Sequence, residues 1–204
     1  MKSLAVFVFP GVQTLDLFGP IELLGGFDDR LALTLVAETE APVATRHGQR
    51  ILPDKSIQEG SNYDLLLIPG GDSAIDVAKS AEAMTWIRET VERADLVMTV
   101  CTGSILLAMS GKLDGLRATT NKQDFRGTVH HGPNVTWVER ARWVQDGKFF
   151  TSSGVSAGMD MALAAAAHLF GQDAAERMAE GSEYEWHRDP DWDPFAEKSG
   201  LVRA

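Results

Sequence analysis

The sequence predicts a single α/β domain in which helices cover both faces of a mostly parallel β-sheet. Three observations predict this fold. Apolar runs of strand length alternate along the chain with helical patterns. The runs are apolar throughout, as strands are when neither face of the sheet meets water. A chain of 204 residues with 44% hydrophobic and 24% charged residues suits one globular domain.

Four apolar runs are predicted to be the parallel strands. The first stops at Pro10-Gly11, the third closes on Gly70-Gly71, and the fourth ends at Cys101, the only cysteine of the chain. Both breaks are residue pairs that end strands and begin turns. The four runs cover residues 4–9, 31–38, 63–71 and 95–101.

Helical patterns lie between and after these strands. Ser80 can cap the N-terminus of one helix, and its apolar residues recur on one face. Asp160 is expected to help begin a strongly apolar helix that ends at Gly171. The predicted helices cover residues 16–26, 80–94, 103–109, 156–171 and 173–182.

Two segments depart from this alternation. The stretch 135–154 has Asp146-Gly147 between two runs rich in Val and Phe, which predicts a small β-hairpin. Residues 183–204 form a tail rich in Pro, Asp and Trp that fits no periodic pattern, so the domain is assigned to residues 1–182. We expect Trp186, Trp192 and Phe195 of the tail to pack on the domain or on a partner subunit. The alternative is that they form a lid over a pocket.

The net charge of −10 argues against partners that carry phosphate. We therefore expect neither nucleic acid nor an anionic membrane to be a partner. The first apolar run is too short to span a bilayer, and no small-residue cleavage site follows it. One cysteine cannot form an internal disulfide, which favours a cytoplasmic protein; a disulfide to another chain is the alternative. The five histidines show no metal-ligand spacing, and the glycines form no nucleotide-binding motif, so no metal or organic cofactor is expected.

Three loops are predicted to meet at the carboxyl ends of the strands, where parallel sheets bind ligands. They carry Asp16, the pair Gly70-Gly71, and Cys101. The helix that begins after Cys101 is expected to lower the pKa of the thiol. The N–H of Thr102, with one from the glycine pair, could hold negative charge that develops on a substrate. Asp16 could move a proton to or from the sulfur.

The same residues also have purely structural interpretations. A cysteine after an apolar run is often buried and inert. Asp16 could simply cap the first helix, and the glycine pair could simply be a turn. Local sequence leaves the structural and the functional interpretation of these residues open.

The chain resembles the DJ-1/PfpI superfamily from about residue 3 to residue 181. The resemblance rests on FPGVQTLDLFGP (9–20), LLLIPGG (65–71), VCTGSILLAMSGKLDG (100–115), ATT (118–120) and SSGVSAGMDMAL (152–163). It implies a flavodoxin-like three-layer sandwich, usually dimeric, with a nucleophilic cysteine at a strained elbow. The motifs LDLFGP and CTGS are most similar to those of the isocyanide hydratase branch and of AraC-type regulators.

Other branches of the superfamily fit less well. Thr102 stands where the peptidase members have a histidine, and Asp16 stands where DJ-1-like and glyoxalase members have a glutamate. The regulators add a helix-turn-helix domain after the sandwich, which this acidic chain is expected to lack. The resemblance therefore favours a cofactor-independent isocyanide hydratase, a lyase that acts on a small molecule and forms a homodimer.

The resemblance also implies a mechanism. Cys101 attacks the terminal carbon of R–N≡C, Asp16 protonates the adduct to a thioimidate, and Asp16 then activates water to release an N-substituted formamide. Thr102 positions groups around the sulfur. Asn121 occupies the place of a family histidine, in ATTNKQ rather than ATTHW, and is expected to affect the choice of substrate.

Two alternatives to this function stay open. The first is another cysteine-dependent enzyme of the superfamily, such as a glyoxalase-like hydratase of carbonyl compounds. The second is a sensor without enzymatic activity, whose thiol is oxidised or which binds a metabolite.

Overall fold

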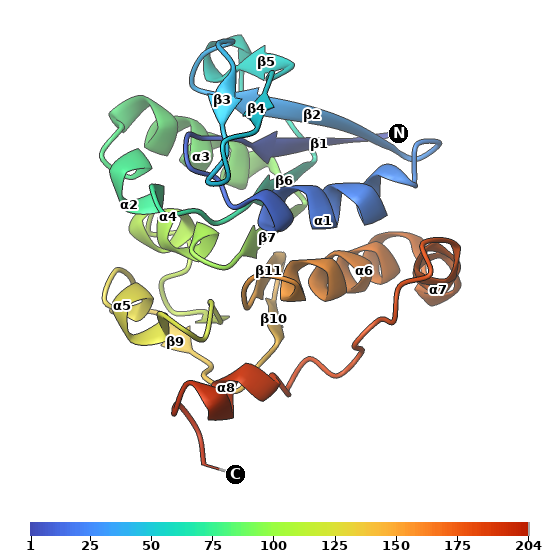
Figure 1. Ribbon diagram of the computed structural model, residues 1–204. Helices are drawn as coiled ribbons and strands as arrows, with labels where there is room; N and C mark the ends of the chain where they lie inside the picture. Colours follow the sequence, from blue (N-terminus) through green and yellow to red (C-terminus); the bar gives the residue numbers. More distant parts are fainter. Residues whose placement is uncertain (204) are drawn as a thin grey trace.

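A seven-stranded sheet forms the centre of the protein in the computed structural model, which describes residues 1–203 (Figure 1). Every neighbouring pair of strands is parallel except β10 and β11, so the predicted mostly parallel sheet is confirmed. In spatial order the strands are β10 (Trp143–Asp146), β11 (Phe149–Ser152), β7 (Leu96–Val100), β6 (Leu65–Ile68), β1 (Lys2–Phe7), β2 (Leu31–Ala37) and β5 (Lys55–Ser56).

The predicted hairpin is present as β10 and β11, but it is shorter than the stretch 135–154. Gly147 in its turn has a φ of 56°, a conformation that glycine adopts easily. The first part of the stretch instead forms β9 (Thr136–Trp137), which pairs in parallel with β8 (Arg117–Ala118). Two further short strands, β3 (Val43–Ala44) and β4 (Arg50–Ile51), form a separate antiparallel pair.

Helices cover both faces of the sheet and complete the three-layer, flavodoxin-like sandwich (Figure 1). On one face, α1 (Thr14–Gly25) packs against α6 (Ala157–Phe170), and α7 (Gln172–Gly181) packs against α6. On the other face lie α3 (Ala81–Arg93) and α4 (Gly103–Met109). The shorter helical segments are η1 (Ile57–Glu59), α2 (Ala74–Val77), α5 (Phe125–Val129) and α8 (Pro194–Lys198).

The core lies between the sheet and these helices, because the inner strands are apolar on both faces. Phe7 of β1 and Leu66 of β6 have no exposed surface. Trp86 of α3 stacks on Phe7, with the ring centroids 5.4 Å apart. Ser80 Oγ accepts a hydrogen bond of 3.2 Å from the Ala83 N–H, which confirms the predicted N-cap of α3. No helix within residues 1–203 is long and apolar enough to cross a membrane.

The order of the strands creates a crevice at the carboxyl ends of β1 and β6. From β1 the chain moves to β2 on one side, and from β6 it moves to β7 on the opposite side. In open α/β sheets, ligands bind at such a switch in direction. The start of α1, the loop after β6 and the turn after β7 all meet at this crevice.

The tail runs beside the edge strand β10 (Figure 1). The N–H of Arg142 donates to the Pro190 carbonyl at 2.7 Å, and the N–H of Asp193 donates to the Arg140 carbonyl at 2.8 Å. Trp186 is buried in the core, whereas Phe195 of α8 remains 40% exposed. Residue 204, the last of the predicted tail, lies outside the described residues.

Candidate active site

Cys101 lies at a strained turn between β7 and α4. Its φ of 55° is in the left-handed region, which residues with a side chain rarely adopt. Gly103 follows because a Cβ atom there would collide with the Ile68 carbonyl oxygen. The Cys101 carbonyl accepts hydrogen bonds from Ser104 Oγ and Thr120 Oγ1, both at 2.9 Å. These contacts fix the turn, and it holds the thiol at the carboxyl end of the sheet.

Asp16 lies in the first turn of α1 and has no exposed surface. Its Oδ2 accepts a hydrogen bond of 3.1 Å from the Gly70 N–H, and the Cys101 thiol interacts with the same carboxyl group. Oδ1 has no N–H or O–H partner among residues 1–203. The residue that caps α1 is Gln13, so the N-cap interpretation of Asp16 does not hold. The structure instead brings Asp16 and Cys101 together, as the sequence predicted.

Burial controls the protonation of this pair. It raises the pKa of Asp16 to about 7, although the Gly70 N–H and the Cys101 thiol act in the opposite direction. Burial also raises the pKa of the Cys101 thiol well above its usual range, and the negative charge of Asp16 raises it further. The N–H and hydroxyl of Thr102 lower it by less.

The expectation of a lowered pKa for Cys101 is therefore wrong in its net result, although the N–H at the start of α4 does act in the expected direction. The thiol is desolvated and faces a carboxylate, and both effects outweigh the favourable N–H at the start of α4. At neutral pH the sulfur is protonated until a base removes its proton. The base in contact with it is Asp16.

The glycine pair holds the site together through its backbone. The Gly71 N–H donates to Thr102 Oγ1 at 2.9 Å, and the Thr102 hydroxyl donates to the Gly71 carbonyl at 3.1 Å. A Cβ atom on Gly70 would lie 2.6 Å from Asp16 Oδ2. Both glycine N–H groups thus have partners within the protein, Asp16 and Thr102, rather than pointing freely at the space where a substrate would lie. They position the carboxyl group and the elbow.

A cavity of about 460 Å³ opens beside Cys101 and Thr102. Asn121 lines it and is held in place, because its Oδ1 accepts from the Asp124 N–H at 2.7 Å and its Nδ2 donates to Thr128 Oγ1 at 3.3 Å. The apolar side chains at the cavity come from Leu15, Val155 and Phe195.

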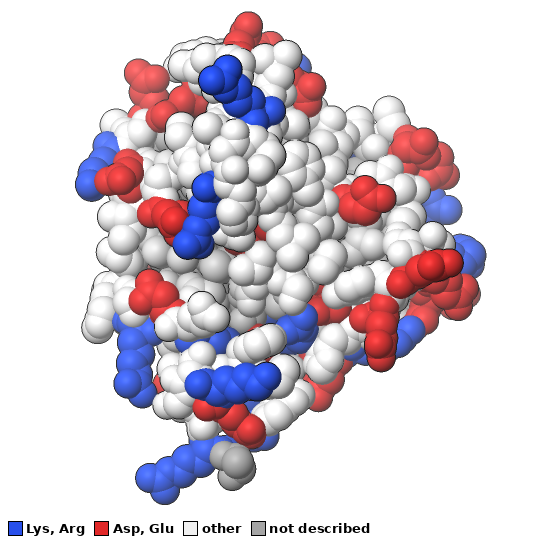
Figure 2. Space-filling view, viewed as in Figure 1, with Lys and Arg blue, Asp and Glu red and all other residues white. Residues whose placement is uncertain are grey.

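The cavity has no excess of charge of one sign. Two basic and two acidic residues line it, namely Arg46, Lys122, Asp72 and Asp124. Arg46 and Asp72 form an ion pair of 3.0 Å with both side chains largely exposed. Figure 2 shows acidic and basic side chains spread over the visible face of the protein around a mostly uncharged centre. The lining therefore gives the cavity no preference for a ligand of one net charge sign.

Sequence reasoning missed several residues of the cavity. Gly154 borders the sulfur so closely that a Cβ atom there would lie 2.6 Å from Cys101 Sγ. Its place in SSGVSAG, just before the predicted helix, is the only signal that pointed to it. Arg46 reaches the cavity from the turn between β3 and β4, which has no recognisable pattern. Within residues 1–203, no three His, Cys, Asp or Glu side chains are grouped to hold a metal ion.

The fold and the elbow define a class of α/β proteins with a cysteine at the carboxyl edge of the sheet. Residues 2–168 match the model of the DJ-1/PfpI family, and the chain belongs to this family.

Three relatives illustrate the similarity. The chain is 34% identical to the isonitrile hydratase of Pseudomonas putida, over 87% of this chain and 76% of that protein. A structure of a ThiJ/PfpI family protein from Pseudomonas syringae superposes with a TM-score of 0.83 and 30% identity, over 94% of this chain and 78% of the other. The Drosophila melanogaster protein dj-1beta is 24% identical over 88% of this chain and 96% of that protein.

Proposed function

We propose that the protein hydrates an isocyanide to an N-substituted formamide, with Cys101 as nucleophile and Asp16 as the group that moves protons. The observation that carries the proposal is the buried Asp16 carboxyl group in contact with the Cys101 thiol. The similarity to an isonitrile hydratase over most of the chain supports the same reaction. The balanced charge of the cavity is compatible with a neutral substrate.

The first half of the reaction forms a covalent adduct. Asp16 takes the thiol proton as the sulfur attacks the terminal carbon of R–N≡C, and a C–S bond forms. Asp16 then returns this proton to the same carbon. The product is the thioimidate S–CH=N–R, and Asp16 is again a carboxylate.

The second half consumes water and frees the enzyme. Asp16 takes a proton from water as its oxygen bonds to the thioimidate carbon, and the proton passes to nitrogen. The intermediate S–CH(OH)–NH–R then collapses: a C=O bond forms, the C–S bond breaks, and the hydroxyl proton passes to sulfur through Asp16. The sum is R–N≡C plus water giving H–CO–NH–R, with thiol and carboxylate restored.

The other residues of the site have supporting roles in this proposal. A group with a pKa of about 7 exists in both protonation states near neutral pH, as a general base and acid requires. Gly70 orients the carboxyl group, and Thr102 places its N–H and hydroxyl near the sulfur. Asn121 contacts the substrate from the cavity wall and contributes to its selection.

Formation of formamide from p-nitrophenyl isocyanide tests the proposal. We expect steady turnover by the wild type and none above background by Cys101→Ala, because the nucleophile is lost. The Cys101→Ala protein should retain its circular dichroism spectrum, which shows that the fold is intact. Absence of turnover by the wild type would refute the hydratase, and turnover by Cys101→Ala would refute the covalent route.

The raised pKa of Cys101 bears on the sensor alternative. Peroxide reacts with thiolates, so with the pKa of Cys101 raised, oxidation requires the same proton removal by Asp16 that hydration requires. The glyoxalase-like alternative would use the same thiol and carboxyl group on a carbonyl carbon. Assay of the wild type with dicarbonyl compounds separates it from the isocyanide hydratase.

We also propose that the protein acts as a homodimer in the cytoplasm. Phe18 of α1 is 41% exposed and does not line the cavity, and an exposed apolar side chain of this kind suits contact with a second copy. The single cysteine fits a reducing compartment. Sedimentation velocity should give about twice the mass of the 22.2 kDa chain, whereas a monomer at all concentrations would refute the dimer.

A further inference from the structure

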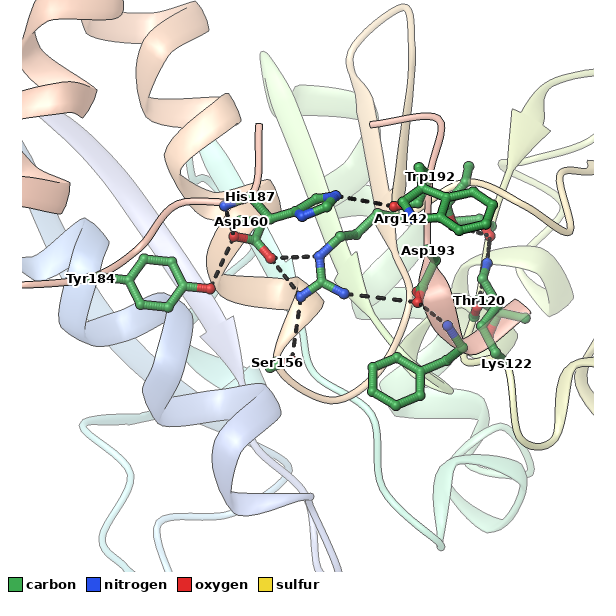
Figure 3. A network of polar contacts seen from close by, with 12 residues as sticks. Thr120, Lys122, Arg142, Ser156, Asp160, Tyr184, His187, Trp192 and Asp193 are labelled. Atoms are coloured by element: carbon green, nitrogen blue, oxygen red, sulfur yellow. Dashed lines mark hydrogen bonds and ion pairs between the residues drawn. The ribbon is translucent and has the colours of Figure 1, made fainter. Parts of the chain in front are cut away.

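The tail is attached to the domain through a buried ion pair (Figure 3). The guanidinium of Arg142, just before β10, donates to Asp160 Oδ2 of α6 through Nε at 2.7 Å and Nη2 at 2.6 Å. The other oxygen of Asp160 accepts from the tail: the Tyr184 hydroxyl and the His187 N–H both donate to Oδ1 at 2.9 Å. Asp160 therefore joins the domain to the tail, a role that helix initiation alone does not explain.

A second carboxylate of the tail, that of Asp193, enters the same network. Asp193 has no exposed surface and lies 3.9 Å from Arg142 Nη1. Its Oδ1 accepts a hydrogen bond of 2.9 Å from the Phe195 N–H and caps α8. Its charge also acts on Lys122, whose pKa burial lowers to about 8 and Asp193 raises. The domain buries two basic side chains, Arg142 and Lys122, and the tail supplies one of the two carboxylates that balance them.

This network fixes α8 against the cavity. The His187 ring lies 3.1 Å, through Nε2, from the Trp192 carbonyl, and the backbone of the tail is hydrogen-bonded to that of residues 140–142. Movement of α8 away from the domain would leave buried charges without partners, and that is costly. Phe195, the second residue of α8, is thus held at the wall of the cavity.

We propose that Phe195 is a specificity-determining residue whose ring contacts the R group of the substrate and favours apolar, aromatic R groups. As to substrate, this inference rests on the proposed function. Phe195 is 40% exposed, and Lys198 Nζ lies 4.9 Å from the centroid of its ring, so a ligand can contact only the part of the ring that Lys198 leaves open. With Leu15 and Val155 it provides the apolar part of the cavity wall, and an aromatic R group gains most from contact with an aromatic ring. Arg142, Asp160 and Asp193 are positioning residues for this wall.

Two ratios measured on Phe195→Ala and Phe195→Leu test the inference. The first is kcat/KM for p-nitrophenyl isocyanide divided by that for ethyl isocyanide. The second is the rate at which N-phenylmaleimide labels Cys101 divided by the rate for N-ethylmaleimide. The second ratio requires no catalysis, and Cys101 is the only thiol that can be labelled. Met109→Ala is the control, because Met109 is equally exposed, at 41%, and does not line the cavity.

Both ratios should fall about tenfold in Phe195→Ala, by less in Phe195→Leu, and stay within twofold of the wild type in Met109→Ala. The wild type could hydrate no isocyanide while the labelling ratio still falls in Phe195→Ala. The proposed function would then fail, but the role of Phe195 in selecting aromatic groups at the cavity would be supported. Unchanged ratios in folded Phe195→Ala, or in Phe195→Leu should the alanine variant not fold, would overturn the inference.

Discussion

Replacement of Asp16 by asparagine should abolish turnover and at the same time stabilise the folded protein at neutral and alkaline pH. Asparagine keeps an oxygen for the Gly70 N–H but cannot carry a proton between the sulfur, the substrate and water. Loss of a general acid and base lowers kcat by about 10³-fold. The measurement is the rate of formamide formation from p-nitrophenyl isocyanide. The exposed carboxyl of Asp28 provides the control, and Asp28→Asn should behave like the wild type.

The effect on stability follows from the raised pKa of Asp16. Between its ordinary value of 3.8 and its value of about 7 in the folded protein, the folded state binds more protons than the unfolded state. The stability of the wild type therefore falls as pH rises through this window, by about 4 kcal/mol in full. Asparagine does not ionise, so the Asp16→Asn protein does not lose this stability as pH rises. The difference in free energy of unfolding between Asp16→Asn and the wild type should thus grow from pH 4 to pH 8 in urea titrations.

The pH dependence of catalysis provides an independent check on the same carboxyl group. Asp16 must be ionised to take the thiol proton, so kcat/KM of the wild type should rise with pH through about 7. The apparent value belongs to the Asp16–Cys101 pair rather than to one residue. A stability difference that does not change with pH, together with a flat kcat/KM profile, would show that Asp16 is ionised normally and is not the base.

Strong local patterns made most of the central sheet predictable. The runs that became β1, β2, β6 and β7 are continuously apolar, and Ser80 caps α3 where a serine precedes a periodic segment. Two-residue strands such as β8 and β9 are too short to show an alternation of apolar and polar residues. Their pairing depends on a contact between segments distant in sequence. The stretch 135–154 misled for this reason: its first apolar run pairs with β8 and not with β10.

The site was predictable where it depends on topology, and unpredictable where it depends on burial. Asp16 and Cys101 follow strands at the same edge of a parallel sheet, so their approach could be inferred. The pKa of Cys101 could not, because desolvation and a facing carboxylate exceed the local effect of a short helix. The network around Asp160 was hidden as well: Arg142 and Asp193 lie in segments without periodic structure, and neighbouring residues do not indicate that they are buried.

Removal of the Asp160 carboxylate should cause the largest loss of stability of any single substitution in the tail network. In Asp160→Ala the guanidinium of Arg142 stays buried and loses the partner at 2.6 Å, while Tyr184 and His187 lose their acceptor. Truncating one member of a buried ion pair costs about 3–5 kcal/mol. We expect this loss in the free energy of unfolding from urea titration. Asp95→Ala breaks an ion pair of similar length, 2.7 Å, that is exposed to water, and should change stability little.

The same variant separates the two roles of the network. Asp160 is proposed both to stabilise the fold and to hold α8 at the cavity. If so, Asp160→Ala should also lower the ratio of phenylmaleimide to ethylmaleimide labelling at Cys101. This ratio is measured under conditions in which the variant is folded. The double variant Arg142→Met with Asp160→Leu removes both charges of the closest pair but leaves the buried Asp193 with Lys122 as its basic neighbour, so it should recover only part of the lost stability. Its tail would still lack the acceptor for Tyr184 and His187, so the labelling ratio should stay low.

Recovery of stability and of the labelling ratio together would mean that the position of α8 depends only on the balance of buried charge and not on the hydrogen bonds to Asp160. A ratio that never changes would mean that α8 is held by its backbone contacts with residues 140–142.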